Sequence, residues 1–230
     1  DAPSLSAEVS VIQGERPKGT EFPDEKFRQI LVDAGYITVL DGAECLLTET
    51  GKAATQLPDL YQKGIVSLKG VEAFTNLTTL EPNGISENLI RELDLSGNTK
   101  LTTIAWKSMI SGWRSYLNRS PLEVLKLGDA PITEGRVVLS QLYCSNPYEA
   151  AESLTVSGNT VKIIEVTLDS YDRVQWLDIT GCPAIQSVSL NSYYLKTLYV
   201  TAEQKSAIDA KRITITDSNY PVSQLQIEAR

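Results

Sequence analysis

The stretch that most constrains the fold of this chain is residues 90–106, IRELDLSGNTKLTTIAW. It contains the spacing L-x-x-L-x-L twice, with the apolar positions filled by Ile90, Leu93 and Leu95 and then by Leu101, Ile104 and Trp106. Side chains two positions apart in an extended segment point to the same face, so each copy predicts a short strand with one apolar face. So short a strand cannot bury that face alone, and the pattern therefore has to recur along the chain.

The pattern does recur, and it is typical of a leucine-rich repeat, whose unit is roughly 20–29 residues long. The central apolar residues of successive units are Leu68, Leu80, Leu93, Ile104, Leu125, Leu142, Leu154, Ile164, Leu177, Val188, Leu198 and Ile213. Most neighbours in this series are about half a repeat apart, so two units would form one coil. We therefore expect a parallel sheet from alternate members, with buried central residues at Leu93, Leu125, Leu154, Leu177 and Leu198.

The two alternating sets differ at the fifth residue after the central one. Asn98, Asn159 and Cys182 occupy this position in the set that contains Leu93, and the other set has neither Asn nor Cys there. An inward asparagine can donate to the backbone of a tight turn that would otherwise bury unpaired groups. A buried thiol can fill the same space as a small apolar side chain.

The remaining segments predict an organisation in three parts: a linker or loosely attached strand at 1–20, a helical N-terminal cap at 21–63, and repeats with a C-terminal cap at 64–230. The cap would start with a helix whose first residue is Pro23 and whose apolar face is Phe27, Ile30 and Leu31, followed by a short helix at 48–56. Apolar spacing predicts helical insertions at 107–121 and 134–150. A helix at 201–211 and the β-like segments RITIT and VSQLQIE would close the chain.

Composition and missing residue types exclude several functions. The chain has 21 Lys and Arg residues and 29 Asp and Glu residues, which gives a net charge of −8. This acidic balance argues against nucleic acid or an anionic membrane as the partner. No apolar run approaches the roughly 18 residues of a membrane span. The chain has no histidine, which removes Ser-His-Asp and Cys-His catalysis and His-ligated zinc. We expect no enzyme activity, no cofactor and no metal.

Three cysteines, Cys45, Cys144 and Cys182, are widely spaced and form no C-x-x-C motif. We expect all three to be reduced, with Cys144 and Cys182 turned inward. The chain begins at Asp1 and its one methionine is Met109, so we expect a processed or truncated product.

Four segments carry a resemblance to a known family: LDLSGNTKLTTI from Leu93, LTVSGNTVKII from Leu154, LDITGCPAIQSV from Leu177 and LKTLYVTAEQK from Leu195. With FPDEKFRQIL and SLKGVEAFTNLTTL, they are similar to the secreted or lipid-anchored leucine-rich-repeat proteins of gut Bacteroidetes. The resemblance implies an α/β fold, a right-handed leucine-rich-repeat solenoid with a parallel β-sheet. It also implies a secreted or outer-surface location in a bacterium, with a lipid anchor upstream as one option, and a binding role without catalytic residues.

One departure from that family concerns calcium. The cap of such proteins often has a D-x-D-x-D-G loop, whereas this chain reads LDGAECLLTE with acids at Asp41, Glu44 and Glu49. Calcium takes six to eight oxygen ligands, so we expect a plain turn at Asp41 and Gly42.

The outward positions of the Asn-bearing set suggest a binding surface. Trp176 and Tyr199 would lie diagonally on neighbouring strands, flanked by Asp178 and Thr197, and aromatic side chains are enriched in binding hot spots. The candidate binding residues are Trp176, Tyr199, Asp178, Thr197, Lys126 and Asp94. The aromatic pair could equally serve to pack the sheet. We expect an adhesion or binding module for a protein partner, with a glycan as the second option. The alternative is a structural or accessory subunit of a surface complex.

Overall fold

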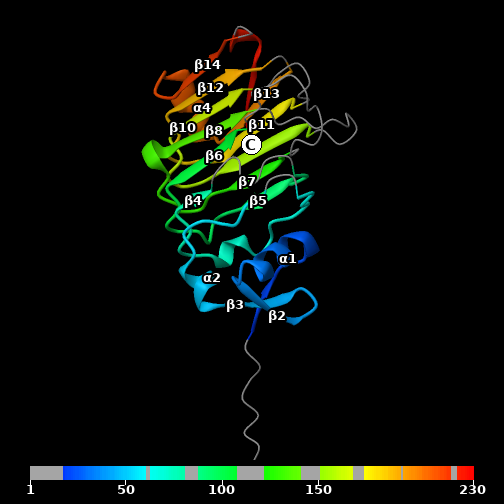
Figure 1. The fold of residues 1–230 in the computed structure, drawn as a ribbon. Coiled ribbons are helices and arrows are strands. Elements are labelled where there is room, and N and C mark those ends of the chain that lie inside the picture. Colours follow the sequence, from blue (N-terminus) through cyan, green and yellow to red (C-terminus); the bar gives the residue numbers. More distant parts are fainter. Residues whose placement is uncertain are drawn as a thin grey trace, which may run out of the picture.

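The computed structural model describes residues 18–60, 63–80, 88–107, 122–140, 151–167, 174–192, 194–218 and 222–230. In this part of the chain the strands divide between two parallel sheets of six strands and one small antiparallel sheet. Figure 1 shows an elongated stack, with the N-terminal cap at one end and the last strands at the other.

The strands of the two parallel sheets alternate along the chain. The odd-strand sheet has the order β15-β13-β11-β9-β7-β5 and consists of β5 (Glu92–Asp94), β7 (Val124–Lys126), β9 (Ser153–Ser157), β11 (Trp176–Gly181), β13 (Thr197–Val200) and β15 (Gln226–Ala229). The even-strand sheet has the order β14-β12-β10-β8-β6-β4 and consists of β4 (Thr79–Leu80), β6 (Thr103–Lys107), β8 (Arg136–Ser140), β10 (Ile163–Thr167), β12 (Ser187–Asn191) and β14 (Thr214–Asp217). The two alternating sets of the sequence therefore form two separate sheets.

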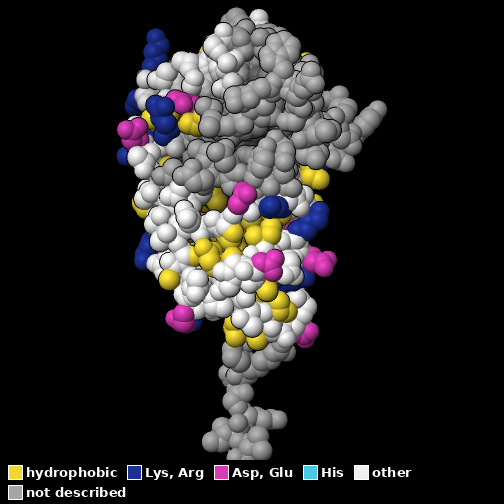
Figure 2. Space-filling view, in the orientation of Figure 1, with side chains coloured by type: hydrophobic (Ala, Val, Ile, Leu, Met, Phe, Trp, Pro, Cys, Tyr) yellow, Lys and Arg dark blue, Asp and Glu magenta, His cyan; other side chains and the backbone are white. Residues whose placement is uncertain are grey.

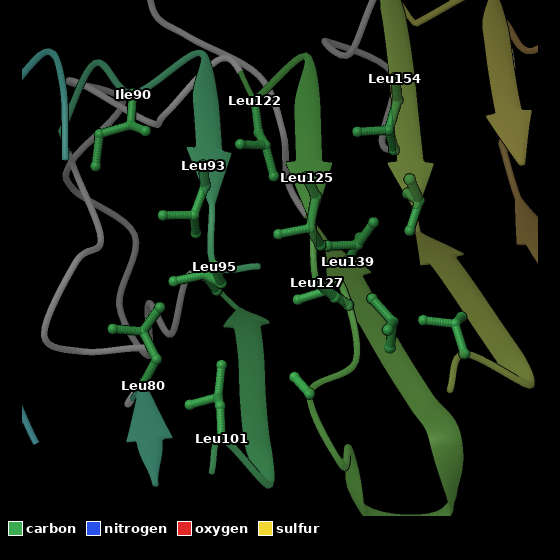
Figure 3. Close-up of a cluster of buried hydrophobic side chains, with 14 of the residues drawn as sticks. Leu80, Ile90, Leu93, Leu95, Leu101, Leu122, Leu125, Leu127, Leu139 and Leu154 are labelled. Carbon is green, nitrogen blue, oxygen red and sulfur yellow. The ribbon is translucent and has the colours of Figure 1, made fainter. Parts of the chain in front are cut away.

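Pairing in the odd-strand sheet follows the expected register except at one interface. The expected central residues pair as Leu93 with Leu125, Leu154 with Leu177 and Leu177 with Leu198. Leu125, however, pairs with Val156 instead of Leu154. Because the shift is two residues, both side chains keep the same face, and both are buried. Figure 3 shows the resulting rows, with Leu93 beside Leu125 and Leu95 beside Leu127.

The even-strand sheet confirms four of the central residues predicted for the set that contains Leu80, and it replaces the other two. Leu80, Ile104, Ile164 and Val188 lie in register, with Val137 between Ile104 and Ile164 and with Ile215 after Val188. Val137 thus holds the place predicted for Leu142, which lies outside the described residues. Ile215 holds the place predicted for Ile213.

The helix predicted at 134–150 is wrong for residues 136–140, which form β8 after the short 3-10 helix η2 (Thr133–Gly135). Val137 and Leu139 are both buried, an alternation with period two that pairs with strands on both sides and overrides the helical spacing. The insertion predicted at 107–121 lies outside the described residues, except for Lys107 at the end of β6.

The fifth residue after the central apolar one is turned inward, as predicted, at Asn98 and Cys182. Asn98 is fully buried, and its Nδ2 donates to the carbonyl oxygens of Val71 at 3.0 Å and Phe74 at 2.9 Å. Cys182 is also fully buried, and its Sγ donates to the Val156 carbonyl at 3.2 Å. Each side chain thus adds a hydrogen bond to a buried backbone carbonyl of the preceding coil.

The same prediction is wrong at Asn159, which is exposed and donates to Oδ1 of Asp129 at 2.7 Å. The turn after Asn159 is one residue shorter. The next buried apolar residue, Val161, follows Asn159 by two positions, whereas Leu101 follows Asn98 by three. The shorter turn places the asparagine on the surface.

The N-terminal cap combines two helices with a sheet that the sequence did not reveal. Helix α1 (Glu25–Asp33) and helix α2 (Glu49–Ala53) accompany the antiparallel sheet of β1 (Thr20–Glu21), β2 (Ile37–Asp41) and β3 (Glu44–Leu47). Phe27 and Leu31 are buried and Ile30 is half-buried. The Asp41–Gly42 segment is the hairpin between β2 and β3, and Gly42 has a φ of +55°, which suits a glycine.

The first helix begins at Glu25, not at Pro23, and its N-cap is Asp24. Its Oδ1 accepts from the Phe27 amide at 2.9 Å, which is the bond of a helix N-cap. Its Oδ2 accepts from the amides of Val66 at 2.7 Å and Ser67 at 3.2 Å. One carboxylate therefore both caps α1 and attaches the cap to the chain that leads into the 3-10 helix η1 (Val71–Ala73).

The C-terminal segments extend both sheets. Helix α4 (Ala202–Asp209) starts with a capping box between Thr201 and Gln204. Strand β14 then pairs with β12, and β15, after the 3-10 helix η3 (Val222–Gln224), pairs with β13. The two β-like segments thus add a further strand to each sheet.

Candidate functional site

A cavity of about 230 Å³ lies on the outward face of the odd-strand sheet, on strands β9, β11 and β13. We call it the Trp176 pocket. Its lining residues are Ser153, Leu154, Thr155, Trp176, Asp178, Tyr199 and Arg230. Three of the six predicted binding residues, Trp176, Asp178 and Tyr199, therefore surround one cavity. Their role in binding stays a prediction.

The register explains why these side chains meet. Trp176 pairs with Thr197 and Asp178 pairs with Tyr199, so Trp176 and Tyr199 are diagonal neighbours on β11 and β13. Adjacent strands lie about 4.8 Å apart, which brings diagonal aromatic side chains within reach of each other. Both rings are half-buried and thus keep part of their surface open.

Asp178 is held in a fixed orientation and has little exposure. Only 7% of the residue is exposed. Its Oδ1 accepts from the Thr180 amide at 2.8 Å and from the Thr180 hydroxyl at 2.7 Å. Its Oδ2 forms an ion pair with the guanidinium of Arg230. The carboxylate is therefore a preoriented charge with one oxygen directed at a cation.

Arg230 is a residue of this site that sequence reasoning missed. Its Cζ lies 4.1 Å from the centroid of the Tyr199 ring, within the range of a cation–π contact. Arg230 reaches the pocket because β15 adds to β13, with Ile227 paired to Leu198. The sequence contains a signal for strand β15, because Ile227 follows Leu198 by 29 positions, a spacing that fits the repeat.

Thr197 does not form the accessible rim that we expected. It is 5% exposed, and on β13 its register partners are Trp176 and Gln226. A hydroxyl with so little exposure is not available to a large partner. The accessible aliphatic hydroxyls of the pocket belong to Ser153, which is exposed, and Thr155, which is half-buried, both on β9.

Lys126 and Asp94 belong to a separate charged group at the other end of the same sheet. Lys126 Nζ lies 2.5 Å from Oε1 of Glu92 and 3.8 Å from Oδ2 of Asp94. The hydrogen bond that Lys126 donates to Glu92 raises the pKa of Lys126 above its usual value. Glu92 and Asp94 also line a cavity of about 510 Å³. Figure 2 shows acidic and basic side chains interspersed at this end of the molecule, around a group of hydrophobic side chains.

Within the described ranges, no group of three or more His, Cys, Asp and Glu side chains has an arrangement that could hold a metal ion. None of the helices in the same part of the chain combines the length and hydrophobicity required to cross a bilayer.

Comparisons with known proteins find a weak likeness among solved structures. No family model matches the chain, and no curated protein matches it. Among solved structures, the chain is similar to the functional domain of InlJ from Listeria monocytogenes, which includes a cysteine ladder. The identity is 15% and the TM-score 0.31, over 91% of this chain and 66% of that one.

Proposed function

We propose that the protein is a non-catalytic binding module that recognises a protein partner through the Trp176 pocket. The supporting observation is the convergence of Trp176, Tyr199 and a fixed, nearly buried Asp178 on one open cavity. Aromatic anchors combined with a few oriented polar groups are the composition of protein recognition sites.

The repeat spacing and the two alternating parallel sheets support the interpretation as a right-handed leucine-rich-repeat solenoid. In such an architecture one sheet face presents side chains from successive coils side by side. The resemblance to Bacteroidetes surface proteins supports an extracytoplasmic location in a bacterium. A glycan is the second candidate ligand, because Ser153 and Thr155 supply hydroxyls beside the aromatic rings.

The test is capture of partners from a host mucosal extract on immobilised protein, run beside a glycan array. The wild-type chain is compared with Trp176→Ala and with Tyr194→Ala. Tyr194 is a matched control because it is 46% exposed and is not part of the pocket lining. We expect a partner that binds the wild type and Tyr194→Ala and that binds Trp176→Ala poorly. Equal capture by all three would show that the pocket is not the recognition site.

A further inference from the structure

The ion pair in the Trp176 pocket joins a nearly buried carboxylate to a half-exposed cation. Asp178 is 7% exposed, whereas 51% of the Arg230 side chain is exposed. A buried carboxylate needs a cation, because its charge is costly to desolvate without one. Asp178 therefore requires a positive partner, while Arg230 is held far less firmly.

The pocket matches a guanidinium in shape as well as in charge. Tyr199 offers a ring face, over which the Arg230 guanidinium already lies at 4.1 Å. Asp178 offers one oxygen, Oδ2, to a cation, and Arg230 pairs with it, whereas Oδ1 accepts from Thr180. A planar cation that stacks on an aromatic face and pairs with a carboxylate is the binding mode of arginine, which is more often found over such faces than lysine. The ammonium of lysine is not planar and cannot stack in this way.

Arg230 is held by its backbone, so only its half-exposed side chain would have to move to vacate the site. It lies one residue beyond the end of β15, where its amide donates to the Val200 carbonyl at 3.0 Å. Because half of the Arg230 side chain is exposed, a competing cation from solution can reach the pair and displace the Arg230 guanidinium. The cavity of about 230 Å³ beside the pair, with Ser153 and Thr155 on its wall, leaves room for the residue that carries the competitor.

We propose that the Trp176 pocket recognises an arginine side chain of a partner protein, and that Arg230 occupies this site in the free protein. The inference rests on the proposed function and names the chemistry of its ligand. The chain contains a built-in comparison: Asp94 makes the same pair of bonds to Ser96 as Asp178 makes to Thr180. The register partner of Asp94 is Lys126, whereas the register partner of Asp178 is the aromatic Tyr199. Asp94 therefore has no aromatic ring beside it on the neighbouring strand, and the ammonium of Lys126 pairs with its carboxylate.

The experiment measures binding of N-acetyl-L-argininamide by calorimetry and by thermal melting. Arg230→Ala empties the site and leaves Asp178 without its cation, so we expect a lower melting temperature than the wild type. We expect N-acetyl-L-argininamide to bind this variant roughly tenfold more tightly than the wild type, and to restore part of the lost melting temperature. N-acetyl-L-lysinamide is the matched control ligand. It should neither bind the variant more tightly than the wild type nor raise the melting temperature of the variant.

In the double variant R230A/D178N, argininamide should neither bind tightly nor raise the melting temperature, because the carboxylate is the group that binds the cation. If Arg230→Ala proves too unstable, Arg230→Gln keeps part of the aliphatic stem and empties the same site. The proposal is overturned if the emptied site binds argininamide no better than the wild type, or if binding survives Asp178→Asn. A partner whose binding is weakened by Trp176→Ala but unaffected by argininamide would overturn this inference alone and leave the proposed function standing.

Discussion

Asn98 and Gln204 make the same pair of hydrogen bonds to the coil that precedes each of them. Asn98 Nδ2 donates to the carbonyls of Val71 and Phe74, which are three residues apart. Gln204 Nε2 donates at 3.1 and 2.9 Å to the carbonyls of Ile179 and Cys182, which are also three residues apart. Both amide side chains are buried, so they close turns whose carbonyl groups water does not reach.

Replacement of Asn98 by Leu should destabilise the protein, because it removes two buried hydrogen bonds and leaves the Val71 and Phe74 carbonyls with only their backbone amide donors. A hydrogen bond contributes roughly 0.5–1.5 kcal/mol net, so we expect the free energy of unfolding to fall by about 1–3 kcal/mol. Urea denaturation measures it. The matched control is Asn159→Leu, in the same S-G-N-T motif but exposed. A similar loss at both positions would contradict the inward and outward assignments.

The strand register predicts the effect of shortening Leu177. This side chain is 1% exposed and pairs with Leu154 on one side and Leu198 on the other. Leu177→Ala should cost about 3 kcal/mol through lost burial and the cavity left behind. Ser189→Ala, at an exposed position of β12, should change stability by less than about 0.5 kcal/mol. An unaltered urea midpoint for Leu177→Ala would place Leu177 outside the core.

The thiol of Cys182 should be inert in the folded protein. Burial raises its pKa from the ordinary value of 9.0 to about 12. At pH 8 the native chain should not react at Cys182 with a thiol reagent, whereas the denatured chain should. A chain in which Cys45 and Cys144 are replaced by alanine isolates the signal. Rapid reaction of that native chain would show that Cys182 is accessible.

The same shift predicts a pH dependence of stability. The folded state keeps the thiol proton at a pH where the unfolded chain has lost it, because the folded pKa lies above the unfolded one. This contribution is therefore intact below about pH 9 and is lost as the pH rises towards about 12. Cys182→Ala removes the thiol and should show a smaller decline over that window. Identical declines for the two chains would exclude the thiol as a cause.

Much of the stack could be predicted because the apolar spacing is itself the cause of the pairing. A leucine that recurs at the same place in each coil buries its neighbour, and a shift by one residue would expose every such side chain. The spacing therefore predicted a parallel sheet from the set that contains Leu93, and the structure places the set that contains Leu80 in a second sheet. The antiparallel sheet of the cap was missed, because two of its three strands are short and none shows a clear alternation.

The errors arise where turn length or a distant contact decides the outcome. Asn159 has the same local motif as Asn98, but a turn shorter by one residue places it outside. The pairing of Leu125 with Val156 depends on how two coils stack, which no single segment specifies. Arg230 reaches Asp178 from 52 positions away in the sequence, so the composition of the Trp176 pocket emerges from the fold as a whole.

The recognition role of the Trp176 pocket is tested most directly by the affinity of Trp176→Ala for the captured partner, measured by titration calorimetry per folded molecule. Trp176 is half-buried and lines an open cavity, so its loss should remove a contact with the partner at a modest cost in folding. We expect binding to weaken by more than about 1 kcal/mol, roughly fivefold in Kd, with Tyr194→Ala unchanged. A Trp176→Ala protein that melts at a much lower temperature, yet binds the partner with unaltered affinity, would show that Trp176 packs the sheet and that recognition occurs elsewhere.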